Sequence, residues 1–214
     1  MSGAPRSFPV PRLAGIYAIV DASLPVLPET LLEQLLAGGI KLVQYRNKSG
    51  VDRSRVRAMH ALTQRSGAVL IVNDDLEAAL EADGLHAGQE DLSAHDVVAV
   101  RARLGSRILG ISCGTAAEAR AAVEAGADYL GVGPFAATAT KLDAGPPLGE
   151  SGVRDVVAAS AVPVAAIGGI GLANLAGVAR TGAAMAAIVS ALGLAADPAA
   201  AAREFTVRWN ELRP

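Results

Sequence analysis

Apolar and polar positions alternate along this chain in two recurring patterns. Continuous apolar runs, such as 15–21 and 69–74, are typical of strands buried on both faces. Between the runs lie segments with apolar residues at helical spacing, such as 28–37. The runs predict strands at 15–21, 41–46, 69–74, 84–87, 107–112, 129–132, 162–167 and 185–190. The helical spacing predicts helices at 28–37, 53–65, 76–81, 95–104, 116–125, 153–159, 174–180 and 198–212.

This alternation, which continues without linkers, predicts an α/β fold. We expect a single-domain (β/α)₈ TIM barrel of parallel strands over residues 13–214. Residues 1–12 carry three prolines, lack the apolar core of a signal peptide and are expected to form a flexible arm. A doubly wound sheet is the competing architecture. It usually places a glycine-rich phosphate loop after its first strand, and no such loop follows Asp21.

Composition narrows the class of protein. Apolar residues make up 51% of the chain but aromatic residues only 3%, so the core must be built from Ala, Val, Leu and Ile. The net charge of −2, without a long basic run, argues against a nucleic-acid partner. The longest apolar stretch, 183–196, is interrupted by Ser190 and Gly193 and is shorter than the about 20 residues that cross a bilayer. One cysteine, Cys113, is consistent with a reducing compartment, and we expect a cytoplasmic protein that binds no membrane.

Polar side chains gather where the predicted strands end, which is where a barrel places its active site. Gln44, Arg46 and Lys48 occupy alternate positions of an extended chain, so their side chains point the same way. The other strand ends and the loops after them contribute Asn73, Asp74, Asp91, Ser112, Thr138, Thr140, Lys141, Gly169, Val189 and Ser190. Their recurrence at one rim predicts a single site.

The charges at this rim suggest what the site binds. The cations Arg46, Lys48 and Lys141 beside the acids Asp74 and Asp91 suit a pyrophosphate held by side chains and Mg²⁺. Helix capping is the alternative role for each of the two acids.

Two further segments suit a phosphate. Gly169 and Val189–Ser190 follow the last two strands, where this barrel commonly binds phosphate through backbone N–H groups. After Gly131-x-Gly133, hydroxyls and a lysine follow, although a polar surface loop would look similar. A dinucleotide fingerprint is excluded because Pro134 leaves no helix for it to open. The loop 139–148 has no apolar periodicity, so we expect it to move when empty and close over bound ligands.

Several of these strings, taken together and in order, resemble thiamine phosphate synthases. The strings are Gln44-Tyr-Arg-Asn-Lys48, Val72-Asn-Asp74, Gly84-Leu-His-Ala-Gly-Gln-Glu-Asp91, Gly131-Val-Gly-Pro134, Thr138-Ala-Thr-Lys141 and Ala166-Ile-Gly-Gly-Ile170. The resemblance implies a transferase that joins 4-amino-2-methyl-5-hydroxymethylpyrimidine diphosphate to thiazole phosphate. The products would be thiamine monophosphate and pyrophosphate, with pyrophosphate leaving by a dissociative route.

The resemblance also implies roles for individual residues. Catalytic contacts to the leaving diphosphate would come from Arg46, Lys48 and Lys141. The pyrimidine substrate would further contact Gln44, Asn73 and Ser112. The thiazole phosphate would be held by Thr138, Thr140, Gly169, Val189 and Ser190. Mg²⁺ would be bound by Asp74 and Asp91. His86 is either a structural imidazole or a substrate contact, and a homo-oligomer is left open.

Two alternatives to this activity remain at this point. One is an isomerase-type phosphate-binding barrel, which would need an acid/base pair instead of cations and Mg²⁺. The other is a non-catalytic phosphate-binding barrel. The related thiazole tautomerases use a catalytic histidine in the region where this chain has Gly114, which argues against that relative.

Overall fold

The computed structural model describes residues 13–88, 94–138 and 145–213. Three predicted site residues, Asp91, Thr140 and Lys141, lie outside this described part. So do the predicted N-terminal arm, 1–12, and most of the predicted mobile loop.

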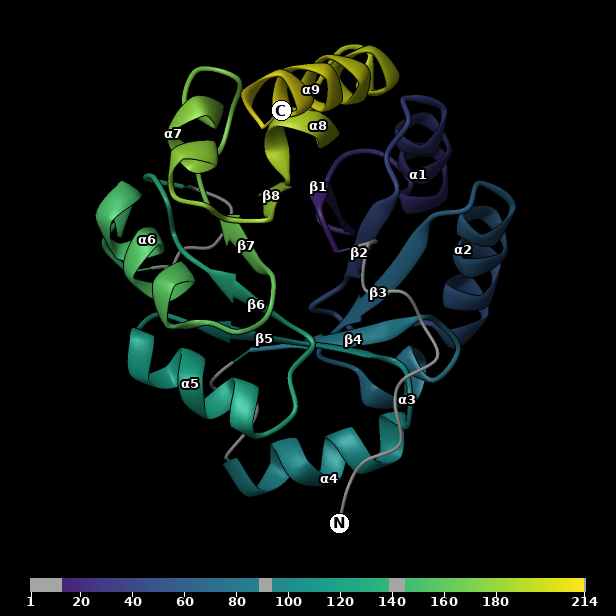
Figure 1. Cartoon of the computed structure of the whole chain (residues 1–214). Coiled ribbons are helices and arrows are strands. Elements are labelled where there is room, and N and C mark those ends of the chain that lie inside the picture. The colour runs from purple at the N-terminus through teal and green to yellow at the C-terminus, as the bar shows by residue number, and fades with distance from the viewer. Residues whose placement is uncertain (1–12, 89–93, 139–144, 214) are drawn as a thin grey trace.

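The described residues form a closed barrel of eight parallel strands, in the order β1 to β8, with helices in a ring around it (Figure 1). The prediction of a (β/α)₈ barrel is therefore confirmed. The strands are β1 (Gly15–Asp21), β2 (Leu42–Arg46), β3 (Val69–Asn73), β4 (Gly84–Ala87), β5 (Ile108–Cys113), β6 (Tyr129–Val132), β7 (Val164–Ile167) and β8 (Met185–Ile188). The helices are α1 (Pro28–Ala37), α2 (Arg53–Arg65), α3 (Leu76–Ala79), α4 (Ala94–Leu104), α5 (Ala116–Glu124), α6 (Gly149–Ala159), α7 (Leu175–Arg180), α8 (Ser190–Gly193) and α9 (Pro198–Leu212).

Two hydrophobic cores follow from the alternation of side chains along each strand. The outer core lies between strands and helices and includes Val43, Tyr45 and Cys113. The inner core fills the barrel and includes Tyr17, Ile71 and Tyr129. Cys113 is buried in the outer core while Ser112 faces inward, as their adjacent positions predict. On β1, β2, β3 and β5 the inward side chains become polar toward the C-terminal end of the strand, where Asp21, Arg46, Asn73 and Ser112 lie.

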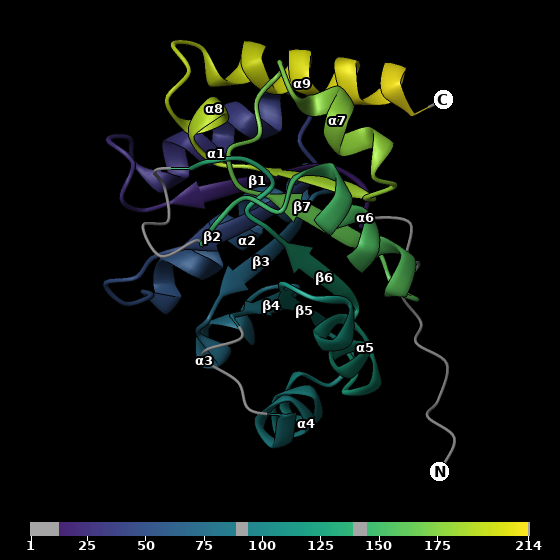
Figure 2. The same ribbon diagram turned by 90° about the vertical axis from the view of Figure 1, so that its left-hand side faces the viewer.

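Helix α9 packs against α1 and α7, and it lies on the opposite side of the barrel from α4 (Figure 2). Its first residues explain its start, since Asp197 accepts a hydrogen bond from the Ala200 N–H (2.9 Å) and Pro198 occupies the first turn. None of the helices in the described residues combines the length and the hydropathy that a membrane-spanning segment needs.

The structure corrects several predicted boundaries. β7 begins at Val164 because Pro163 has no N–H to donate to the ladder. β3 ends at Asn73 because Asp74 has a φ of 61°, which leaves the extended region. The predicted strand to Ser190 is wrong at its end, since β8 stops at Ile188 and Ser190 opens the short helix α8. Helix α6 begins at Gly149, before its predicted start.

Candidate active site

Arg46 is held at the rim by an ion pair with Asp21. The two residues end neighbouring strands and are direct partners in the register of β1 and β2. The Arg46 guanidinium donates to Asp21 Oδ2, while the backbone N–H and the hydroxyl of Ser23 donate to Asp21 Oδ1 (2.9 and 2.7 Å). Burial alone would raise the pKa of Asp21, but these hydrogen bonds and the Arg46 charge outweigh it and hold that pKa below 3.8. Arg46 is therefore a fixed cation rather than a mobile one.

A second ion pair joins two more predicted site residues, Lys48 and Asp74. Lys48 Nζ lies 3.1 Å from Asp74 Oδ2, and the same oxygen accepts from the Asn73 side-chain amide (2.5 Å). Asp74 Oδ1 accepts from the Gly88 N–H (3.3 Å). The structure thus brings Lys48, Asn73 and Asp74 together, with the Asp74 side chain 26% exposed at the rim.

Asp74 does not cap helix α3. Its neighbour Asp75 is the N-cap residue, with Oδ1 accepting from the Ala78 N–H (2.9 Å). The capping alternative for Asp74 is therefore wrong, and its carboxylate, in a left-handed backbone conformation, has no such structural task. Within the described residues, no group of three or more His, Cys, Asp or Glu side chains could hold a metal.

Gln44 and Ser112 are linked through the barrel interior by side chains from other strands. Gln44 Nε2 donates to the Tyr17 hydroxyl (2.8 Å), which lies 2.7 Å from the Tyr129 hydroxyl. His86 Nδ1 lies 2.9 Å from the Tyr129 hydroxyl, and His86 Nε2 lies 3.0 Å from Ser112 Oγ. We call these five residues the interior chain. Its bonds identify His86 as an interior link, which sequence reasoning had left open.

His86 is neutral at ordinary pH. Burial lowers its pKa from 6.5 to about 4, although the nearby Asp74 charge acts in the opposite direction. A neutral imidazole carries one N–H, so one ring nitrogen must accept a hydrogen bond while the other donates.

Acid is therefore expected to destabilise the fold through His86. Between pH 6.5 and 4 the unfolded chain binds a proton that the folded chain does not, so the free energy of unfolding falls as pH decreases. The loss over this range should be at most about 3 kcal/mol. Urea unfolding across this range measures it. His86→Gln, which does not titrate, should lack this component, and parallel curves for the two proteins would contradict the prediction.

The loops after β7 and β8 carry the residues that were predicted to bind a phosphate, Gly169, Val189 and Ser190. Gly168 and Gly169 have φ values of 97° and 63°, which favour glycine. The Asn174 side chain fixes this turn, because its Nδ2 donates to the Gly169 carbonyl and its Oδ1 accepts from the Gly171 N–H (both 2.8 Å). After β8, Val189 precedes α8, the short extra helix with which this barrel commonly binds phosphate.

The segment after β6 lies against the same turn. The Phe135 N–H donates to the Ile167 carbonyl (2.8 Å) and the Ala136 N–H to the Gly168 carbonyl (3.0 Å). A side chain on Gly133 would collide with the Ile167 backbone, so this glycine is needed for close approach. Thr138, at the end of this segment, is half-buried.

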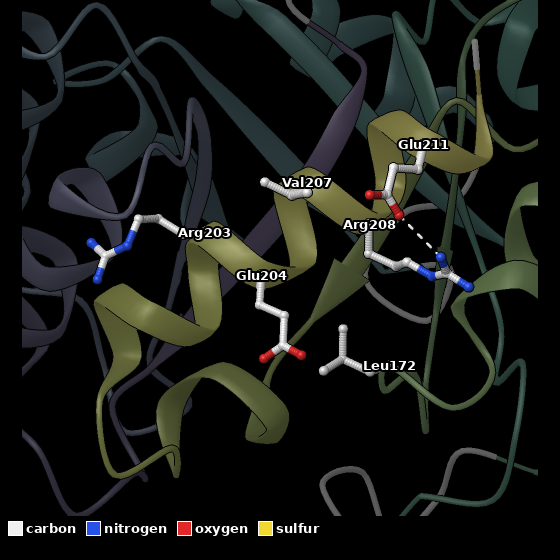
Figure 3. Close-up of a pocket in the computed structure, with 6 residues that line it drawn as sticks. All are labelled: Leu172, Arg203, Glu204, Val207, Arg208 and Glu211. Carbon is white, nitrogen blue, oxygen red and sulfur yellow. Dashed lines mark hydrogen bonds and ion pairs between the residues drawn. The ribbon is translucent and has the colours of Figure 1, made fainter.

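A shallow concave surface lies away from the rim. A groove of about 490 Å³ on α9 is lined by Val207, Leu172 and four charged side chains, with Arg208 bonded to Glu211 (3.0 Å; Figure 3). None of the predicted site residues lines this groove. The groove on α9 is therefore separate from the predicted site residues.

The sequence does not reveal Asp21, Tyr17 and Tyr129 as partners of the site residues, and it leaves two roles open for His86. Asp21 carried a usable signal, since a carboxylate ends the first apolar run just as Arg46 ends the second. The two tyrosines carried no such signal, because they are 112 positions apart and read as ordinary apolar positions.

Comparisons with known proteins show which family the chain belongs to. A family model described as thiamine monophosphate synthase matches residues 16–192. The thiamine-phosphate synthase of Moorella thermoacetica is 50% identical over 200 residues, which cover 89% of this chain and 93% of that protein. The corresponding enzyme of Chloroflexus aurantiacus is 42% identical over 197 residues, covering 89% and 90%. The solved thiamine phosphate pyrophosphorylase from Pyrococcus furiosus superposes with a TM-score of 0.85 at 30% identity, covering 95% of this chain and 98% of that one. The chain belongs to the thiamine monophosphate synthase family.

Proposed function

We propose that the rim joins 4-amino-2-methyl-5-hydroxymethylpyrimidine diphosphate to thiazole phosphate, forming thiamine monophosphate and releasing pyrophosphate. The observation that carries this proposal is the meeting of Arg46, Lys48 and Asp74 at one rim, above an uncharged interior chain. Cations beside a carboxylate suit a diphosphate, and the uncharged chain suits a neutral ring.

The proposed mechanism is dissociative. The bond between the pyrimidine methylene and the diphosphate breaks first, and the amino group of the ring stabilises the resulting cation. The thiazole nitrogen then attacks through its lone pair, so no general base is required. The protein has to stabilise the growing charge on pyrophosphate and hold the two reactants in line. We assign the first task to Arg46, Lys48 and Lys141.

Mg²⁺ is the proposed cofactor. It would bind Asp74 and Asp91 and neutralise charge on the diphosphate oxygens. The partly exposed Asp74 carboxylate supports this assignment, because it is a hard oxygen donor oriented by Asn73 and Gly88 rather than used as a helix cap.

The thiazole phosphate is assigned to the opposite part of the rim. Gly169, Val189 and Ser190 would approach it through the backbone, and Thr138 and Thr140 through hydroxyls. The glycine turn after β7 and the start of α8 support this assignment, since the first N–H groups of a helix lack intrahelical acceptors.

Pyrophosphate release tests the proposal. The protein is mixed with both substrates, with either substrate alone, and with both in the presence of a chelator. We expect release only with both substrates and Mg²⁺. Release without the thiazole phosphate would indicate a hydrolase, and equal release with chelator would exclude the metal.

Asp74→Asn is expected to raise the Mg²⁺ concentration needed for turnover while leaving the fold nearly unchanged. Asparagine tolerates the left-handed backbone at this position, and the lost pair with the exposed Lys48 should cost at most about 1 kcal/mol. Metal titrations of activity measure the requirement, and thermal unfolding measures stability. Asp75→Asn is the matched control, because asparagine also caps helices well and the metal titration should not change. An unchanged titration in Asp74→Asn would remove this residue from the metal site.

A further inference from the structure

We propose that the interior chain has a single proton direction, which fixes the Gln44 amide and makes the site select a substrate ring that carries an amino group. In this view Tyr17, Tyr129 and His86 are positioning residues that act through Gln44 and Ser112. The inference rests on the proposed function for the identity of the ring.

The direction follows from counting protons. Burial raises the pKa of Tyr17 and of Tyr129, so each phenol keeps its one hydrogen. Gln44 Nε2 can only donate, so the Tyr17 oxygen accepts from it and donates its own hydrogen to Tyr129. Tyr129 then donates to His86 Nδ1, which leaves the single imidazole hydrogen on Nε2, facing Ser112 Oγ.

An interior chain in which the hydrogens point in mixed directions would be energetically costly. If Tyr129 donated to Tyr17 instead, the Tyr17 oxygen would accept two hydrogen bonds and its own hydrogen would have no acceptor in the chain. Tyr17 is only 2% exposed, and an unpaired buried donor costs about 1–3 kcal/mol. The hydrogens of the interior chain are therefore ordered as one unit, and Gln44 Nε2, which faces Tyr17, sets that order toward Ser112.

The packing around the Tyr129 and His86 rings limits how far these side chains can move. A side chain on Gly110 would lie well under 3.0 Å from three atoms of Tyr129. A side chain on Gly131 would lie 2.9 Å from His86 Cε1. The tyrosine and imidazole rings occupy the space that these two glycines leave, and the Tyr17 and Tyr129 rings meet edge to face at 5.9 Å. The links are consequently held at hydrogen-bonding distance.

The order of the hydrogens determines which atom Gln44 presents to a ligand. An isolated glutamine can turn its amide and present either an acceptor or a donor to a ligand. Here a turned amide would require both phenols, the imidazole and Ser112 to reverse their hydrogens as well. With Nε2 facing Tyr17, Gln44 Oε1 is the acceptor left for a ligand, and the Ser112 O–H is a donor. An amino group on a pyrimidine meets the acceptor, whereas an oxo group in its place would meet it with a second acceptor.

The tautomer of His86 tests the direction. Nitrogen-15 spectra of the side-chain imidazoles at neutral pH should show His86 protonated on Nε2, with His86→Gln used to assign the signal. A hydrogen on Nδ1 would overturn the proposed direction. This measurement needs no substrate, so it stands apart from any failure of the proposed function.

Ligand selectivity tests the coupling. The probes are the aminopyrimidine diphosphate and its analogue with oxo in place of amino, with each dissociation constant measured by calorimetry without thiazole phosphate. Wild type should favour the amino compound by about 100-fold or more, as expected when a buried polar group loses its partner. Tyr17→Phe should reduce this ratio at least tenfold, because it removes the phenol that accepts from Gln44 Nε2 at 2.8 Å and so orients the amide.

Tyr45→Phe is the matched control, since it removes a buried phenol from the same barrel but on the outer face of β2. It should leave the affinity ratio unchanged. Tyr129→Phe provides a second break in the chain if Tyr17→Phe folds poorly, and it should also alter the His86 tautomer. An unchanged affinity ratio in a folded Tyr17→Phe or Tyr129→Phe protein would overturn the proposal, whereas absent turnover in wild type would count against the proposed function alone.

Discussion

Replacing Gly110 with alanine is expected to lower the free energy of unfolding by about 3 kcal/mol, the upper end of the usual range for an overfilled core. The new methyl group would point into the barrel and lie well under 3.0 Å from ring atoms of Tyr129. Tyr129 is fully buried and cannot swing into solvent, so the ring or β5 must move. Denaturant unfolding followed by fluorescence or circular dichroism measures the loss.

Two further variants separate this collision from a general intolerance of alanine. Gly114→Ala, just beyond the same strand, meets only an ordinary contact at 3.6 Å and should change stability little. In a Tyr129→Leu background, which lacks the colliding ring, Gly110→Ala should lower the free energy of unfolding by less than it does in wild type. If Gly110→Ala cost the same free energy of unfolding in both backgrounds, the collision would not be the cause.

The architecture could be predicted from the sequence because apolar runs and helical spacing recur around the whole barrel. Strands at the first and sixth positions, Gly15–Asp21 and Tyr129–Val132, match their predicted limits. The limits failed where one residue overrode the pattern, as Pro163 did by lacking an N–H and Asp74 did by leaving the extended conformation. Helix α8 was missed because its few residues are too short to display helical periodicity within an apolar run.

The candidate site could be predicted in part. The alternation of side chains along β2 predicts that Gln44 and Arg46 lie on one side of the strand. Because TIM barrels have their active sites at the C-terminal ends of the strands, the polar residues at these ends were expected to lie together. What the sequence could not supply was which interior hydroxyl meets which partner. Tyr17 and Tyr129 come close only when the barrel closes. Likewise, only the packing shows that the Tyr129 and His86 rings need glycines beside them.

Arg46→Ala is expected to lower kcat by about 10²–10³, the usual effect of losing one preorganised donor to a developing charge. Pyrophosphate carries more negative charge as it leaves, so a cation fixed by Asp21 should bind the transition state more strongly than the ground state. The same change should reduce the free energy of unfolding by about 3–5 kcal/mol, because Asp21, 3% exposed, would be left buried without its counter-ion. Steady-state kinetics and denaturant unfolding measure the two effects separately.

The double variant Arg46→Ala, Asp21→Asn distinguishes catalysis from stability. Asparagine carries no charge and can still accept from Ser23, so the double variant should recover much of the lost stability. It should not recover kcat, because the rim still lacks the Arg46 cation. Arg103→Ala is the control for removing an arginine from an exposed pair, with Glu77, and should be nearly silent in both measurements. If kcat returned together with stability in the double variant, Arg46 would act only by neutralising Asp21, and stabilisation of the leaving group would fall to Lys48, Lys141 and Mg²⁺.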